Sequence, residues 1–186
     1  MFISIQGGIF VHKKGKISLR GLTAGAMMAA LSIILERVLA IMPASNMMDV
    51  RVSLSNIPII LAGVLVSPLV GAVSGVVSDI IGCFISGYAP FPILTLAPLV
   101  MGLAPGIILN KKGEYPFIKV VFALAVTHLI SSVIITSAGL CIMRGVPFIP
   151  MLVTRLASMS INFALDTVLV YLLLRTPITK IQEREK

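Results

Sequence analysis

The fold is decided by residues 53–86, SLSNIPIILAGVLVSPLVGAVSGVVSDIIGCFIS. This stretch is apolar almost throughout, and it is longer than one membrane-spanning helix, which needs about 20 residues. Ser67-Pro68 divides it, because proline does not fit the interior of a helix. We therefore expect a short helix over 53–66, followed by a longer one over 68–86.

The composition of the chain excludes a water-soluble class. The 186 residues are 58% hydrophobic and 12% charged, with a mean hydropathy of +1.07, whereas soluble domains carry about 25% charged residues. The net charge of +8 is compatible with nucleic acid binding, but most of it lies in short loops and tails beside apolar segments. A chain embedded in the lipid bilayer, with no nucleic acid partner, explains that placement better.

Hydrophobic length predicts six transmembrane helices in one integral membrane domain that covers residues 1–186. A polar loop over 44–52 follows the first helix, and the Gly- and Pro-rich segment 87–92 is a turn or an irregular loop. The predicted fold class is an all-α membrane protein, a compact bundle of six transmembrane helices. Their ranges are about 19–42, 53–66, 68–86, 93–109, 116–143 and 147–175.

The cationic residues fix the predicted orientation. Six spans put both termini on one side of the membrane, and most of the Lys and Arg residues then map to that side. The positive-inside rule makes this side cytoplasmic, so we expect a multi-pass protein of the bacterial plasma membrane. The residues concerned are Lys13, Lys14, Lys16, Arg20, Lys111, Lys112, Lys119, Arg175, Lys180, Arg184 and Lys186.

The remaining four cations, Arg37, Arg51, Arg144 and Arg155, fall at or near the opposite face. Arg37 and Arg155 lie inside apolar helices, where a charge is costly and is kept mainly for function. Converging guanidinium groups suit a carboxylate or phosphate ligand. Snorkelling or a structural ion pair explains Arg37 equally well. Arg155 lies farther from the face, which favours a water-filled cavity or a buried partner.

Two acids and one histidine also fall within predicted helices. Asp79 can bond a polar ligand ring or neutralise an arginine, whereas Asp166 lies deeper and is interpreted as structural. A histidine placed like His128, in the middle of a helix, packs within a bundle more often than it binds a ligand. The sequence has no catalytic motif and no metal-ligand spacing, so we expect neither enzyme chemistry nor a cofactor.

Small residues recur at a spacing of four along the first predicted helix. Ala26 and Ala30 form one stripe, and Gly21, Gly25 and Ala29 form the next. Such stripes let a second helix approach closely. A partner subunit and a helix of the same bundle both fit this spacing.

A family resemblance is carried by residues 50–63 (VRVSLSNIPIILAG), 68–72, 79–82, 87–90 and 94–102 (LTLAPLVMG). These segments resemble the S components, the substrate-binding membrane subunits of energy-coupling factor (ECF) vitamin transporters. The resemblance extends over nearly all of the chain from the first to the last predicted helix. Within the family, the chain is most similar to the folate-specific members.

The resemblance implies a protein that binds an anionic vitamin, folate, in an outward cavity and does not hydrolyse ATP itself. It implies docking onto a transmembrane coupling (T) subunit that carries two cytoplasmic ATPase subunits. Ala26-Met-Met-Ala-Ala30 matches the AxxxA pattern that faces the coupling subunit in the family. Arg37 and Arg155 match two arginines of the folate members, and loop 44–52 matches the segment that gates the cavity.

Folate combines an anionic glutamate tail with a flat, polar pterin ring. Outer-half arginines suit the tail, polar side chains such as Asn56 suit the ring, and aromatic side chains, with Phe84 and Phe163 among the candidates, can stack on it. The Met-rich loop 44–52 and residues 159–161 depart from the folate members, which leaves another vitamin of the family as an alternative. The predicted ligand contacts are Arg37, Arg51, Asp79, Tyr88, Phe91, Thr95, His128 and Arg155.

A different class of protein, a self-sufficient proton-coupled secondary transporter, also fits some of these residues. It would use Asp79, His128 and Asp166 for proton coupling. Inverted repeats would support it, but the halves 19–86 and 93–175 have no obvious self-similarity.

Overall fold

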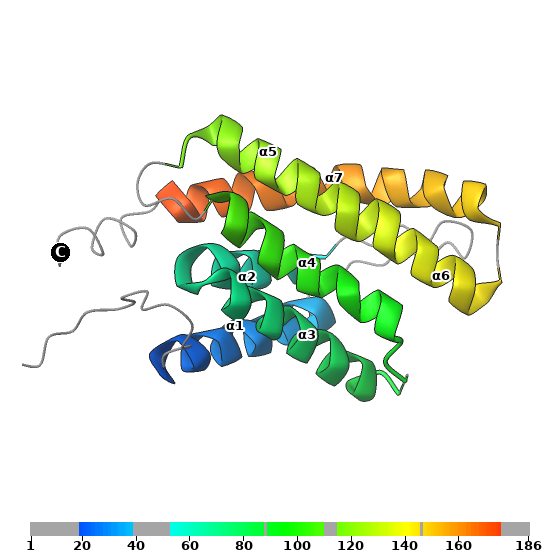
Figure 1. The fold of residues 1–186 in the computed structure, drawn as a ribbon, viewed down its shortest axis with the longest axis horizontal. Coiled ribbons are helices and arrows are strands. Elements are labelled where there is room, and N and C mark those ends of the chain that lie inside the picture. Colours follow the sequence, from blue (N-terminus) through cyan, green and yellow to red (C-terminus); the bar gives the residue numbers. More distant parts are fainter. Residues whose placement is uncertain (1–18, 39–52, 88, 110–114, 146, 176–186) are drawn as a thin grey trace, which may run out of the picture.

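The structure, a computed structural model, describes residues 19–38, 53–87, 89–109, 115–145 and 147–175 (Figure 1). Every secondary-structure element in these ranges is a helix, in agreement with the predicted all-α class; η1 and η2 are π-helical turns. In chain order the elements are α1 (Leu19–Val38), α2 (Asn56–Leu61), η1 (Ala62–Val66), α3 (Pro68–Ile85), α4 (Pro92–Leu109), α5 (Phe117–His128), η2 (Leu129–Ile135), α6 (Thr136–Arg144) and α7 (Phe148–Arg175).

The helices lie along the long axis of the molecule and alternate in direction (Figure 1). Helix α1 begins and helix α7 ends at the same end of the bundle. We call this the inner end, after the cytoplasmic side predicted for it, and the opposite end the outer end. The assignment of these ends to the two sides of a membrane stays a prediction.

Five helical segments in the described ranges are long and apolar enough to cross a membrane, as in a multi-pass membrane protein. The segment predicted over 53–66 is shorter: Asn56–Val66 consists of six α-helical residues followed by five π-helical ones. A sixth full crossing is therefore a prediction that these helices leave open. The five spans are Leu19–Arg37, Pro68–Ile85, Pro92–Leu109, Phe117–Met143 and Met151–Arg175.

The division between η1 and α3 falls at Ser67, where the sequence predicts it. Ser67 has an extended backbone, with φ −168° and ψ 155°, and its side chain accepts a hydrogen bond from the backbone N–H of Val70. Pro68 occupies the first turn of α3, where its missing N–H leaves no helical bond unmade. The capping serine and the proline together turn the chain back at the inner end.

Glycines let η1, α3 and α4 touch backbone to backbone in the inner half. A Cβ atom added to Gly63 would overlap the carbonyl oxygen of Gly102, and one added to Gly106 would meet that of Gly63. A Cβ atom on Gly102 would in turn overlap the carbonyl oxygen of Gly71. We call these four residues the glycine seam, and they let the three backbones pack in direct contact in the inner half.

Apolar side chains form a buried cluster in the inner half. Ile60, Val120, Leu124 and Val170 have no exposed surface, and they belong to one cluster formed by α2, α5 and α7. The polar side chains of the interior are therefore concentrated in the middle and the outer half of the bundle.

Candidate ligand-binding site

A cavity of about 220 Å³ opens among the helices on the outer side of the glycine seam. Its lining comes from α1, α2, α3, α4, α7 and the continuous segment α5–η2–α6. Two carboxylates, Glu36 and Asp79, line it together with the guanidinium of Arg155 and the imidazole of His128. Polar groups inside an apolar bundle are costly to bury. Their concentration around one cavity identifies it as the candidate site.

Asp79 is held in the cavity wall by helix α4. The hydroxyl of Thr95 donates a hydrogen bond of 2.8 Å to Asp79 Oδ2, and Thr95 Oγ1 also lies 3.3 Å from the carbonyl oxygen of Phe91. Thr95 therefore acts on the cavity through Asp79, since it is not itself among the lining residues. Phe91, just before α4, is half-buried and does not line the cavity.

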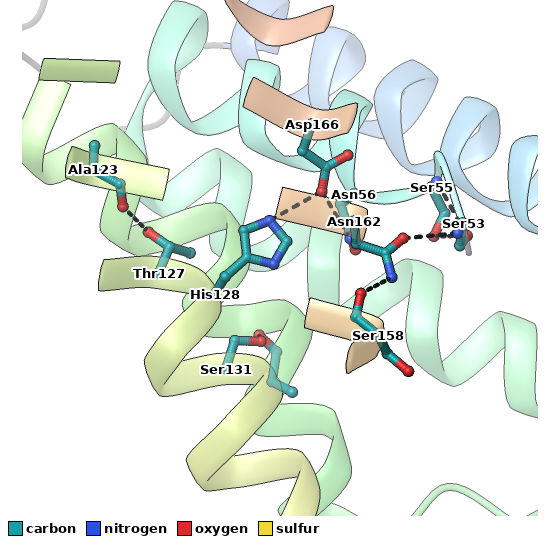
Figure 2. A network of polar contacts seen from close by, with 11 residues as sticks. Ser53, Ser55, Asn56, Ala123, Thr127, His128, Ser131, Ser158, Asn162 and Asp166 are labelled. Atoms are coloured by element: carbon teal, nitrogen blue, oxygen red, sulfur yellow. Dashed lines mark hydrogen bonds and ion pairs between the residues drawn. The ribbon is translucent and has the colours of Figure 1, made fainter. Parts of the chain in front are cut away.

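A buried polar group lies on the opposite wall, between α5 and α7. His128 Nε2 lies 3.1 Å from Asp166 Oδ2, and both side chains are almost completely buried. The side-chain amide of Asn56 donates a hydrogen bond of 3.1 Å to the same carboxylate oxygen (Figure 2). The ring of Phe163 packs edge-on against the imidazole, with centroids 6.0 Å apart. Asp166 thus supports two residues that line the cavity.

The start of helix α2 is fixed by side chains from α1 and α7. Asn162 accepts a hydrogen bond from the backbone N–H of Ser53 at 2.9 Å and donates one to the carbonyl oxygen of Ser158 at 2.8 Å (Figure 2). Ser32 donates one to the carbonyl oxygen of Ser55 at 2.8 Å. All five residues line the cavity. The α2 N-terminus is therefore a well-ordered part of the cavity wall.

Arg37 and Glu36 point in different directions. The Arg37 guanidinium donates hydrogen bonds to the carbonyl oxygen of Gly82 and the hydroxyl of Ser86, at the C-terminus of α3. A cation there interacts favourably with the last carbonyl groups and with the helix dipole. Glu36, its neighbour in the sequence, lines the cavity, whereas Arg37 does not. The ligand contact expected of Arg37 stays a prediction.

The other predicted contacts divide into three groups. Arg155, Asp79 and His128 are brought together by the cavity, and Thr95 reaches it through Asp79. Phe84 is 67% exposed on the outside of α3, so its surface faces away from the packed interior. Arg51 and Tyr88 lie outside the described residues.

Sequence reasoning missed Glu36 and the serines of the lining, although helical spacing contains the signal. Ser158 and Asn162 follow Arg155 at three and seven residues, and Asp166 follows at eleven. Residues at these intervals share one helix face. A polar stripe along an otherwise apolar α7 therefore marks the cavity side of that helix.

Outside the cavity, α1 and α3 form a small apolar groove of about 90 Å³. Gly25 and Ala29 are buried against α3, where Ser74 donates a hydrogen bond of 2.9 Å to the carbonyl oxygen of Gly25. Ala26 and Ala30 are exposed on the outer surface of the same helix, and Ala26 lines the groove. The two stripes of small residues thus differ in exposure.

Comparison with known proteins agrees with this architecture. The family model described as "ECF transporter, substrate-specific component" matches residues 20–179. The folate transporter FolT of Clostridium novyi (strain NT) is 27% identical over 148 residues, which cover 78% of this chain and 83% of the relative. A crystal structure of FolT bound with folic acid has the same fold, with a TM-score of 0.70 and 23% identity; the match covers 84% of this chain and 93% of that chain.

Proposed function

The chain belongs to the family of substrate-specific components of ECF transporters, and we propose that it captures folate in the polar cavity from the outer side of the membrane. The observation that carries this proposal is the charged lining inside an apolar bundle. A relative known as a folate transporter supports the choice of vitamin. As a member of a transporter family, the chain is proposed to bind its ligand without changing it chemically.

The charges around the cavity suit the two ends of folate. Glu36 and Asp79 come from the adjacent helices α1 and α3, whereas His128 and Arg155 come from α5 and α7. Carboxylates accept hydrogen bonds from N–H groups such as those of a pterin ring, and a guanidinium pairs with a carboxylate. We place the pterin against α1 and α3 and the glutamate tail against Arg155.

Transport would depend on partner subunits that supply the energy. The exposed stripe of Ala26 and Ala30 and the groove between α1 and α3 suit close contact with a helix of a coupling subunit in the plasma membrane. Two ATPase subunits on the cytoplasmic side would drive release of the vitamin.

Calorimetry on the purified protein in detergent tests the ligand. Folate should bind with a stoichiometry of one, and riboflavin, which has no anionic tail, should not compete with it. Pteroate lacks the glutamate tail and should bind more weakly than folate. The Arg155→Ala variant should bind folate and pteroate with similar affinity, because the group that distinguishes them is gone. Preferential binding of riboflavin would overturn the folate assignment.

The buried His128–Asp166 pair is the observation that favours the alternative, a proton-coupled secondary transporter. Liposomes that contain only this chain distinguish the two functions. A substrate-specific component should give binding without accumulation of folate, whatever pH gradient is imposed. Accumulation driven by the gradient would establish the secondary transporter instead.

A further inference from the structure

One carboxylate is buried away from solvent and lies against a histidine. Asp166 is fully buried, and its Oδ2 atom is shared between His128 and Asn56. Its other oxygen, Oδ1, has no hydrogen-bond partner in the described part of the chain. A buried carboxylate with so few partners is costly. A proton on the adjacent imidazole would offset that cost by forming an ion pair.

The imidazole is placed between this carboxylate and the cavity. His128 lines the cavity, and its Nε2 atom faces Asp166, while Nδ1 points away from it (Figure 2). A carboxylate beside Nε2 favours the tautomer that carries its proton there. A second proton would then enter at Nδ1 and would turn the ring into a cation beside any bound ligand.

The charged groups around His128 determine how strongly binding of an anion favours this second proton. Of the helices that surround the cavity, α1 contributes Glu36, α3 contributes Asp79, and α7 contributes Arg155 and Asp166. Helices α2 and α4 contain no charged residue. Asp166 thus faces the imidazole directly, whereas Glu36, Asp79 and Arg155 share the cavity with it. An anionic ligand adds further negative charge to a site of low dielectric, where such repulsion is poorly screened.

We propose that folate binding is coupled to the uptake of a proton by His128, which pairs with Asp166 on one side and with the anionic vitamin on the other. The inference rests on the proposed function, because it needs an anionic ligand in this cavity. The proton comes from solvent, enters with the ligand and leaves with it. Such coupling changes the affinity at equilibrium, and it does not make the chain a proton-driven transporter.

The direction of the pH dependence follows from the linkage between proton uptake and ligand binding. Binding that takes up a proton is strengthened as pH falls and weakened as pH rises. Where His128 is neutral in the free protein and protonated in the complex, the dissociation constant should rise about tenfold per pH unit.

Isothermal titration calorimetry of the full chain with folate measures the proton directly. Titrations at one pH, in buffers with different ionisation enthalpies, give the number of protons exchanged from the slope of the binding enthalpy. We expect uptake of up to one proton at pH 8, with a matching fall in affinity between pH 7 and pH 9. A binding enthalpy independent of the buffer, with folate clearly bound, overturns the proton uptake and leaves the proposed function standing.

Two variants assign the proton to its site. His128→Gln keeps a polar side chain beside Asp166 but cannot titrate, so its proton uptake should be close to zero. Asp79→Asn removes a titratable group from the opposite wall, and it should keep the uptake even where its affinity changes. Uptake that persists in His128→Gln, or is lost in Asp79→Asn, places the proton elsewhere and overturns the assignment.

The wild-type and Asp166→Asn proteins keep the inference testable if His128→Gln does not fold. The Asp166→Asn substitution removes the carboxylate that pairs with the imidazolium, so it should reduce proton uptake while thermal unfolding reports a folded bundle. Undiminished uptake in folded Asp166→Asn contradicts the role of the pair. Failure of the wild type to bind folate at any pH removes the proposed function and this inference together.

Discussion

The inner and outer halves of the bundle are built from the same helices but packed in opposite ways. In the inner half, the glycine seam brings the backbones of η1, α3 and α4 into direct contact. In the outer half, Ser78 and Asp79 of α3 and Ala97 of α4 line a cavity, and the Thr95 hydroxyl of α4 donates a hydrogen bond to Asp79. The same pair of helices therefore packs backbone to backbone in the inner half and contributes side chains to a cavity in the outer half.

This comparison indicates that side-chain size along α3 and α4 determines where the two backbones leave room for a ligand. Toward the inner end, Gly71 and Gly102 offer no side chain to hold the backbones apart, and nothing larger than hydrogen fits between them. Toward the outer end, a hydrogen bond between the side chains of Thr95 and Asp79 links the two helices at the cavity wall. The cavity therefore lies on the outer side of the backbone contacts of the glycine seam.

The largest expected effect comes from a side chain forced into the seam. Gly102→Ala places a Cβ atom on top of the Gly71 carbonyl oxygen, and backbone atoms cannot move aside as a flexible side chain would. Overpacking of this kind costs about 3 kcal/mol, a large part of the stability of an ordinary domain. The thermal unfolding midpoint in detergent should fall sharply, and folded protein should be recovered poorly.

Gly82→Ala is the matched control, since it adds the same Cβ atom to α3 near its outer end. There the nearest atoms are the ends of the Glu36 and Arg37 side chains, 3.7 and 3.8 Å away, which is an ordinary contact distance. This variant should unfold like the wild type. Equal stability of the two variants would contradict the close packing of the seam.

The second effect separates the two arginines predicted from the sequence. Arg155 lines the cavity, so Arg155→Ala should weaken folate binding by about 2–5 kcal/mol. Arg37 holds the C-terminus of α3, and Arg37→Ala should lower the thermal unfolding midpoint more than the affinity. Calorimetry and thermal unfolding on both variants measure this difference. A binding loss in stable Arg37→Ala equal to that in Arg155→Ala would establish the ligand contact expected of Arg37.

The two arginines also show how much of the fold and the site could be predicted from the sequence. Apolar length and the Ser67-Pro68 pair predicted the helical class and the division between η1 and α3. Spacing on α7 could also have predicted the polar stripe from Arg155 to Asp166. In both cases the signal lies within one segment, where the helical period fixes which residues share a face.

Contacts between segments could not be predicted from the sequence. Glu36 and Arg37 are adjacent on α1, and which of them faces the cavity depends on how α1 rotates against α3. The π-helical turns η1 and η2 likewise depend on neighbouring helices, because hydropathy alone carries no information on local backbone geometry. Tertiary packing decided these features.

The third prediction moves from the interior to the outer surface of α1. Combined Ala26→Leu and Ala30→Leu substitutions keep helix propensity but hold a docking helix away from the exposed stripe. ATP-dependent uptake with the coupling and ATPase subunits should fall by at least about tenfold, equivalent to about 1.4 kcal/mol of lost association. Folate binding by the isolated protein should be unchanged, because neither residue lines the cavity.

A joint loss of folate binding and thermal stability in this variant would instead mean that the stripe packs within the bundle. Gly25→Leu is an informative contrast, since Gly25 is buried against Val70 on the neighbouring stripe. It should destabilise the isolated protein, which Ala26→Leu with Ala30→Leu should not. Normal uptake by the double variant would place the docking surface elsewhere.

The smallest effect concerns the hydroxyl that holds Asp79 in the cavity wall. Thr95→Val keeps the shape of the side chain but removes the 2.8 Å hydrogen bond to Asp79 Oδ2, which leaves the carboxylate free to rotate. Folate should bind more weakly by about 1 kcal/mol, the usual net contribution of one such bond. Thr127→Val is the matched control, because Thr127 is buried, bonds only the Ala123 carbonyl oxygen and does not line the cavity. Equal affinities in the two variants would mean that Asp79 needs no support from α4 to contact the ligand.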